Sequence, residues 1–315
     1  VHLESISYHV KNATVKAIAD PFMNDETKAF CEGFGVKDIY TDYKKILEDK
    51  EIDAVLVCSS TDTHSTISIE AIEAGKHVFC EKPIATSYDL ACEMAEEAKK
   101  QGKMLNIGVC NRYHKSVEML REMNERGEFG NIYHVYCSFR SHRSIPGLGG
   151  AFTTKAESGG GVLIDWGVHF FDLILYILGS PELKTLSCNA YNEMAKDIKS
   201  YTYKSMWAED TMDPEGTNDV DDMITGFIRT SGSSISFNGA WAQNLDKAEM
   251  FIDFLGDKKG ARLTYGGQFE VTDGQTLETV ATNHEIPNMY LREDEDFIHS
   301  VETGEKNRNH IENVL

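Results

Sequence analysis

Residues 54–83 read AVLVCSSTDTHSTISIEAIEAGKHVFCEKP, and this stretch decides the fold class. Residues 54–58 form a continuous apolar run, which is typical of a strand buried on both faces. Residues 63–74 have the pattern of a helix that stops at Gly75, and residues 77–80 form a second apolar strand. A strand, a helix and a strand in this order predict two parallel strands joined by a helical crossover.

The alternation of strands and helices continues on both sides of this unit. Strands are predicted at residues 15–19 and 104–109, and helices at residues 25–34, 42–50 and 87–101. We therefore predict an α/β Rossmann domain, with a doubly wound parallel sheet, over residues 1–110.

After residue 111 the pattern changes. A helix at residues 116–126 is followed by seven predicted strands, at residues 132–140, 186–191, 223–229, 234–241, 250–255, 260–264 and 269–272. Several of these alternate polar and apolar side chains, which indicates an antiparallel sheet with one wet face. We predict a second, α+β domain over residues 111–315, built on a large open antiparallel sheet, with a long loop at residues 192–222.

The acidic composition argues against nucleic acid and membrane partners. The 315-residue chain has 51 acidic and 31 basic residues, a formal net charge of -20. Such a surface repels phosphate backbones and anionic lipid, so we expect neither nucleic acid nor a membrane as partner. The seven cysteines are dispersed, which favours reduced thiols in the cytoplasm and predicts no metal site. The longest apolar stretch, residues 162–178, carries three ionisable side chains, so we expect no membrane span there.

The start of the chain lacks an expected motif. A dinucleotide-binding fold opens with a strand and a G-x-G-x-x-G turn, whereas residues 1–6 read as the body of a helix. Either ~25–30 residues precede this sequence, the length of a strand, a turn and a helix start, or the chain is a fragment that binds no cofactor. We favour the first, because a sheet without its central strand would expose two unpaired edges.

Polar residues follow three of the predicted strands. Asp20, after the first, is placed to accept hydrogen bonds from an adenosine ribose, which predicts NAD over NADP; an ordinary turn Asp before Pro21 is the alternative. Ser59, Ser60, Thr61 and His64 follow the next strand, where small hydroxyl residues let a cofactor approach, although helix capping explains part of this pattern.

Glu81, Lys82 and Pro83 follow the strand at residues 77–80, at the carboxyl edge where open α/β sheets bind ligands. A lysine there can hydrogen-bond a substrate hydroxyl and stabilise a developing alkoxide, whereas an isolated Glu-Lys pair is usually a surface salt bridge.

Residues 159–172 carry the strongest chemical signal, GGGVLIDWGVHFFD, and its three leading glycines allow the backbone to be approached closely. On a regular helix Asp165 and His169 lie on one face, with Asp172 on the same side. An acid beside an imidazole predicts a general base with a partner that orients it.

Taken together, these motifs resemble the Gfo/Idh/MocA oxidoreductases, the family of glucose-fructose oxidoreductase and inositol 2-dehydrogenase. The resemblance extends over nearly the whole chain, including the later strand-turn-strand at residues 254–263. It implies that Lys82 and His169 are catalytic, that Asp165 binds substrate, and that Arg112, after the last Rossmann strand, contacts substrate. It also implies a homodimer or homotetramer assembled through the open sheet.

The function predicted from this resemblance is hydride transfer between a sugar, cyclitol or related polyol CH–OH group and NAD, with NADP less favoured. Cofactor contacts are expected from Asp20, Ser59, Ser60, Thr61, His64, Glu81 and Lys82, and substrate contacts from Arg112, Asp165 and His169. Two alternatives keep the fold: an NAD-dependent redox-neutral glycosidase, and a non-catalytic dinucleotide sensor. Further sugar contacts are expected from the loops, at His142, Arg143, Tyr201, Tyr203 and Trp207.

Overall fold

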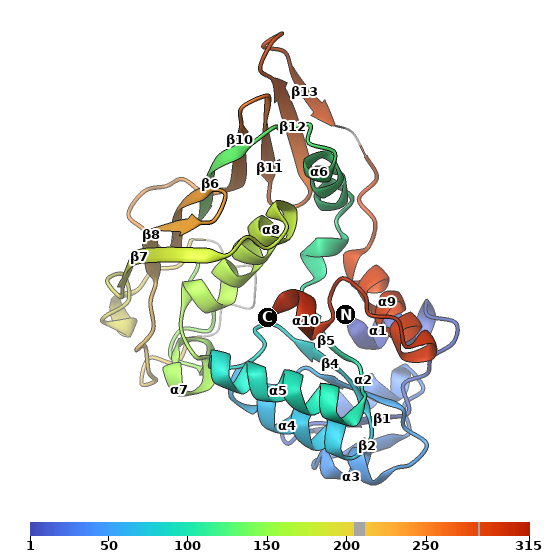
Figure 1. The fold of residues 1–315 in the computed structure, drawn as a ribbon. Helices are drawn as coiled ribbons and strands as arrows, with labels where there is room; N and C mark the ends of the chain where they lie inside the picture. The colour runs from blue at the N-terminus through green and yellow to red at the C-terminus, as the bar shows by residue number, and fades with distance from the viewer. Residues whose placement is uncertain (205–211, 283) are drawn as a thin grey trace. The chain divides into compact units, whose positions relative to one another are not determined.

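The computed structural model describes residues 1–204, 212–282 and 284–315. The chain forms two compact units: Val1–Tyr113 with Pro287–Leu315, and His114–Ile286 (Figure 1). The sequence-based boundary after residue 110 assigned residues 287–315 to the second domain, whereas the structure groups them with the first unit.

The first unit alternates short strands and helices. Its strands are β1 (Ala17–Ala19), β2 (Asp38–Tyr40), β3 (Ala54–Val57), β4 (His77–Glu81) and β5 (Leu105–Gly108). Its helices are α1 (His2–Tyr8), α2 (Asp25–Gly33), α3 (Lys44–Glu48), α4 (Thr61–Glu73), α5 (Tyr88–Gln101), the 3-10 turn η1 (Cys110–Tyr113), α9 (Met289–Thr303) and α10 (Ile311–Val314). Among the described residues, β1 pairs with β2 and β3–β4–β5 form a second sheet. Every pair is parallel, as predicted.

Local signals set the helix ends in this unit. The Ser87 hydroxyl caps α5 by accepting from the Leu90 N–H, and Gly102 ends the helix with a φ of 64°, in the left-handed region that glycine favours. Buried side chains of β3, β4, α4, α5 and β5 then form one hydrophobic cluster, which includes Val57, Ile72, Val78, Met94 and Ile107.

The end of the chain completes the first unit. Asn106 in β5 forms an isolated antiparallel bridge with His310, and the Ile107 N–H donates to the Asn309 carbonyl over 2.9 Å. Phe297 of α9 is buried and packs edge-on against Phe79 of β4, with 5.6 Å between ring centroids.

The second unit is built on one large sheet. Its strands are β6 (Ile132–Arg140), β7 (Leu183–Tyr191), β8 (Met223–Thr230), β9 (Ser234–Ala240), β10 (Glu249–Gly256), β11 (Lys259–Thr264), β12 (Gln268–Asp273) and β13 (Thr279–Thr282). Across the described residues their order is β13-β12-β11-β10-β6-β9-β8-β7. The predicted large open sheet is confirmed, and its described strands pair antiparallel except for β6 and β9, which pair in parallel and make the sheet mixed. Alternating polarity reveals a half-buried strand but not the direction of its neighbour.

The helices α6 (Lys115–Glu125) and α8 (Val168–Leu178) lie along this sheet (Figure 1). The shorter helical elements of this unit are the 3-10 turns η2 (Ala151–Thr153) and η4 (Ile198–Ser200), α7 (Lys155–Ser158) and the π-helical turn η3 (Leu163–Gly167). Phe170 of α8 stacks on Phe139 of β6, with 4.9 Å between centroids.

Residues 155–178 contain a helix long and apolar enough to cross a membrane by length and composition alone. In the structure, 44% of its most apolar window is buried, and Phe170, Ile174 and Ile177 belong to the hydrophobic core of the second unit. These contacts are those of a core helix.

Candidate active site

The first unit presents its polar residues at the ends of parallel strands. Asp20 directly follows β1, and its Oδ1 accepts the Phe22 N–H over 2.8 Å. Its own N–H donates to the Tyr40 carbonyl on β2. Asp20 therefore forms the ordinary turn that was the alternative interpretation, while its position at the carboxyl end of β1 is the one expected for a ribose-binding acid.

The loop after β3 is joined to the loop after β4 by His64. The side chain of His64, 1% exposed, lies with Nδ1 2.8 Å from the Pro83 carbonyl and Nε2 3.0 Å from the Ser59 carbonyl. Ser60 is the N-cap residue of α4 but makes no capping bond with its side chain. Thr61 begins that helix, and the Thr63 hydroxyl lies 2.7 Å from Ser59 Oγ. His64 thus holds two strand-end loops together.

Glu81, at the end of β4, is bound by His2, a residue that lies outside the sequence motifs described above. His2 Nε2 lies 2.9 Å from Glu81 Oε1, and His2 Nδ1 lies 2.7 Å from Asp294 Oδ1. Burial opposes the charge on His2, but the hydrogen bonds to Asp294 and Glu81 raise its pKa to about 10. The other Glu81 oxygen accepts the Lys82 N–H over 3.0 Å, so this cluster holds the backbone that carries Lys82.

Arg112, from which the resemblance implied a substrate contact, is bound to the C-terminal segment. It is 3% exposed, and its guanidinium donates to the carbonyl oxygens of Arg308, over 2.6 Å, and Asn313, over 3.2 Å. These bonds tie η1 to the returning C-terminal segment.

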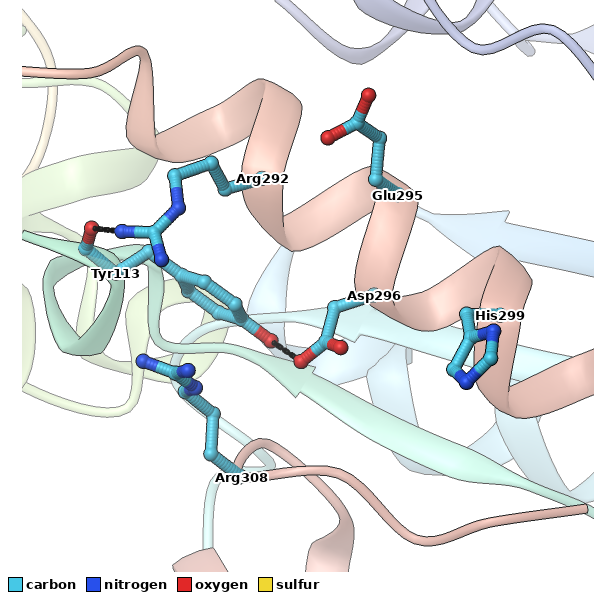
Figure 2. A pocket seen from close by; sticks show the side chains of 6 residues that line it. All are labelled: Tyr113, Arg292, Glu295, Asp296, His299 and Arg308. Carbon is cyan, nitrogen blue, oxygen red and sulfur yellow. Dashed lines mark hydrogen bonds between the residues drawn. The ribbon is translucent and has the colours of Figure 1, made fainter.

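The segment next to Arg112 lines a pocket of about 290 Å³ within the first unit. Its lining residues are Tyr113, Arg292, Glu295, Asp296, His299 and Arg308 (Figure 2). The Tyr113 hydroxyl donates to Asp296 over 2.7 Å, and burial together with Asp296 raises the pKa of Tyr113 far above its ordinary value. None of the site residues predicted from the sequence lines this pocket.

In the second unit, Asp221 contacts the backbone at the glycine run of residues 159–161. The Gly161 and Leu163 N–H groups donate to the two carboxylate oxygens of Asp221, over 2.9 and 3.1 Å. The Val162 N–H donates to the Asp221 carbonyl over 2.9 Å. A Cβ at position 161 would lie 1.8 Å from that carbonyl oxygen, so only glycine fits. The glycine run in the sequence allowed a close approach here, but no local pattern identified Asp221 as the partner.

Asp165 lies in a π-helical turn, and His169 lies in the α-helix that follows it. Residues Leu163–Gly167 form a π-helical turn, in which the Val168 N–H bonds to the Leu163 carbonyl five residues back. The prediction of one regular helix through both residues is therefore wrong at this turn, because an inserted residue shifts which side chains share a face. Such wide turns are frequent at functional sites.

The Asp165 side chain has a buried partner that the sequence did not indicate. The indole Nε1 of Trp241 donates to Asp165 Oδ2 over 3.3 Å, and Trp241 is 1% exposed. Trp241 directly follows β9, and its own N–H donates to the Asp222 carbonyl over 2.9 Å. Because Asp165 and Trp241 are 76 residues apart, no local pattern pairs them.

The predicted sugar-contacting loop residues of the second unit are largely engaged with one another. Tyr201 and Tyr203 pack edge-on with 4.9 Å between centroids, and the Arg143 guanidinium lies 5.6 Å from the Tyr201 ring. His142 Nδ1 lies 3.3 Å from Asp246. Trp207 lies outside the described residues.

A parallel-stranded unit with polar strand ends, followed by a unit built on a large mixed sheet, defines a class of two-domain, dinucleotide-dependent enzymes. Comparison with known proteins agrees with this class. Residues 1–109 match an oxidoreductase family with an NAD-binding Rossmann fold, and residues 117–262 match the Gfo/Idh/MocA C-terminal domain. The chain belongs to the Gfo/Idh/MocA oxidoreductase family, as the sequence motifs predicted.

Individual relatives agree with this assignment. The chain is 31% identical over 279 residues to D-glucoside 3-dehydrogenase of Escherichia coli K12, covering 88% of this chain and 77% of that protein. It is 34% identical over 179 residues to myo-inositol 2-dehydrogenase of Thermotoga maritima, covering 57% and 51% of the two chains. A structure of levoglucosan dehydrogenase with NADH and levoglucosan has a TM-score of 0.81 over 99% of this chain and 90% of that one. At 20% identity this last likeness shows the fold.

Proposed function

We propose that the protein oxidises or reduces one CH–OH group of a sugar or cyclitol, with NAD as the hydride partner. The observation that carries the proposal is the position of Asp165 in the π-helical turn and of His169 at the start of α8, in a chain related to enzymes named for glucoside and inositol oxidation. An acid and an imidazole are suited to bind a polyol and to remove a hydroxyl proton.

The donor set of the first unit fits a dinucleotide. Hydroxyl side chains at Ser59, Ser60 and Thr61 surround the start of α4, and Glu81 and Lys82 end the next strand. Helix starts and strand ends of this kind supply hydrogen bonds to phosphate and ribose. Asp20 supports NAD over NADP, because a carboxylate beside the ribose repels a 2′-phosphate.

The roles that we propose follow from the chemistry of each side chain. His169 accepts the hydroxyl proton of the substrate, and Asp165 accepts hydrogen bonds from a neighbouring hydroxyl. Lys82 donates to the reacting oxygen and stabilises the charge that develops on it. NAD, when bound by the strand-end residues of the first unit, would supply the acceptor for the hydride of the carbinol carbon. We leave Arg112 out of the substrate set, because its guanidinium binds the C-terminal segment.

We also propose that the enzyme is a cytoplasmic homodimer or homotetramer. The edge strand β7 is exposed along all nine residues, and Leu183, Leu186 and Tyr191 are among its exposed apolar side chains. An open strand of this kind is suited to pair with a second copy. The seven cysteines are free thiols, in keeping with a reducing compartment.

The test is the absorbance of reduced nicotinamide, followed with NAD or NADP and a panel of sugars, cyclitols and sugar acids. We expect the absorbance to grow with one substrate class and to prefer NAD. Cleavage of an aryl glycoside without accumulation of NADH would instead indicate a redox-neutral glycosidase. NAD binding with no turnover of any substrate would indicate a dinucleotide sensor.

A further inference from the structure

Asp221 fixes the start of the helix that carries Asp165. It receives three backbone N–H groups, from Gly161, Val162 and Leu163, through its two carboxylate oxygens and its carbonyl. A carboxylate that accepts helix-start N–H groups is stabilised both by these bonds and by the helix dipole. The position of the π-helical turn is therefore set by a residue 60 positions further along the chain.

The next residue, Asp222, anchors Trp241. Asp222 is 2% exposed, and its carboxylate accepts the N–H groups of Glu193 and Met194, over 2.8 and 2.6 Å. Its carbonyl accepts the Trp241 N–H, and the following residues begin β8, in which Met223 pairs with Ala240 of β9. The backbone of Trp241 is therefore fixed by the ends of two paired strands.

The indole of Trp241 then reaches Asp165. Its Nε1–H donates to Asp165 Oδ2 over 3.3 Å, and the ring is among the largest fully buried side chains. A buried indole cannot turn to another partner without opening the core, and an indole N–H is a donor only. One of the groups that hold the Asp165 side chain is thus a neutral donor that does not titrate.

We propose that Trp241 is a positioning residue, which holds the Asp165 carboxylate in the orientation that binds a substrate hydroxyl. The proposal rests on the proposed function for its kinetic consequence, but its geometric part can be tested without substrate. Neither the glycine motif nor the acid-histidine spacing contains this residue, which acts only through Asp165.

The geometric test follows the indole N–H signals of the tryptophans by NMR spectroscopy. The chain has three tryptophans, Trp166, Trp207 and Trp241, so protein with ¹⁵N-labelled tryptophan gives three indole N–H signals, and Trp241→Phe identifies one of them. We expect Asp165→Asn to shift the Trp241 signal. Asp219→Asn is the control, because Asp219 also accepts a helix-start N–H, that of Lys155 over 2.7 Å, but at α7. A Trp241 signal that does not respond to Asp165→Asn would overturn the proposal.

The kinetic test uses Trp241→Phe, which keeps the buried ring and removes the N–H. Hydrogen bonds to charged groups are worth about ten- to a hundredfold in an equilibrium. We expect KM for the sugar to rise about tenfold, with a smaller change in kcat and an unchanged Kd for NAD. In the Asp165→Asn background the same substitution should change KM less than twofold, because its partner is already altered. Additive effects of the two substitutions would contradict a role through Asp165.

The two tests separate two kinds of failure. A wild-type enzyme that turns over no sugar, cyclitol or sugar acid would refute the proposed function, and the indole spectrum would then decide the Trp241–Asp165 contact by itself. Asp221→Asn perturbs the same contact in a second way, through the start of the helix that carries Asp165. It should also shift the Trp241 signal and raise KM, whereas Asp219→Asn should do neither.

Discussion

The two units hold their chemical groups with different kinds of partner. In the first unit the Glu81 carboxylate, which braces the Lys82 backbone, is bound by the imidazole of His2, and that ring also contacts Asp294. In the second unit the Asp165 carboxylate is bound by the indole N–H of Trp241, and the start of its helix is bound by Asp221 through backbone N–H groups.

The hydrogen bonds of His2 in the first unit depend on pH, whereas those from the indole and backbone N–H groups in the second unit do not. An imidazole between two carboxylates binds them strongly only while it is protonated, whereas indole and backbone N–H groups do not titrate in the range of protein stability. We therefore expect the first unit to lose stability in alkali through His2, and the hydrogen bond from the Trp241 indole to Asp165 to be independent of the charge on His2.

The largest expected effect is that of replacing His169 in the second unit, which should impair catalysis without weakening cofactor binding to the first unit. His169→Ala should lower kcat about 10²–10⁴-fold, the usual contribution of a general base, and leave the Kd for NAD unchanged. Steady-state kinetics and a binding titration measure the two quantities. His134→Gln serves as the control in the same unit, because His134 contacts Ser234 on the sheet rather than the helix. An unchanged kcat for the alanine variant would remove His169 from the mechanism.

The next effect is the pH dependence of stability from His2. Its pKa is raised to about 10 in the folded state, from an ordinary value of 6.5. The stabilisation is complete below pH 6.5 and is lost as the pH rises toward 10, because the folded state then keeps a proton that the unfolded state has released. We expect the free energy of unfolding to fall by a few kcal/mol across this window, measured by urea denaturation at several pH values.

His2→Asn should lower the stability near pH 7 and flatten this profile. The free energies of unfolding are compared between pH 7 and 8. Burial raises the pKa of the thiols of Cys80 and Cys110, so these groups affect stability mainly at higher pH, where unfolded thiols ionise. His77, His114 and His310 have their pKa lowered by burial, and they affect stability only on the acid side. A slope that is equally steep in wild type and variant would show that His2 is not its source.

Much of the fold could be predicted from local patterns. The bounds of β6 agree with the alternating run at residues 132–140, and the glycine at the end of α5 agrees with the predicted stop. By contrast, α9 was missed because two of its buried positions, Glu293 and Asp294, are acids that break the apolar periodicity. Burial of acids is possible there because their partners, Asn309 and His2, come from distant segments.

The candidate site shows the same limit. The positions of Asp165 and His169 could be selected from residue types at a suitable spacing, but the π-helical turn between them could not, because it depends on packing of the whole helix. Gly161 signalled a close approach, whereas its partner Asp221 is identified only by the fold. Arg112 had the right residue type for a substrate contact, yet carbonyl oxygens of the C-terminal segment bind its guanidinium.

A smaller effect is expected from filling the space beside Gly161. In Gly161→Ala the new Cβ would meet the Asp221 carbonyl oxygen at 1.8 Å, so the backbone of one of the two segments must move. Such overpacking costs about 1–3 kcal/mol, measurable by denaturant unfolding, and should also raise KM for the sugar by displacing Asp165. Gly160→Ala is the matched control, because its Cβ would meet a side-chain atom, Ile164 Cγ1 at 2.7 Å, which can move more easily. Equal losses in both variants would show that the Asp221 contact is not special.

The smallest expected effect is a gain in the first unit, at a glycine that no contact requires. Gly33 is the last residue of α2, has no positive φ, and would present a Cβ to open space. Gly33→Ala should therefore stabilise the protein by about 0.4–1 kcal/mol, since alanine reduces the conformational entropy of the unfolded chain and keeps the helical backbone. Thermal and denaturant unfolding measure the gain, and kcat and KM should stay unchanged because the substitution touches neither His2 nor Asp165. A loss of stability would contradict the open space that the structure shows around a Cβ at position 33. The opposite signs expected at positions 33 and 161 then distinguish a glycine that only ends a helix from one that a carbonyl oxygen requires.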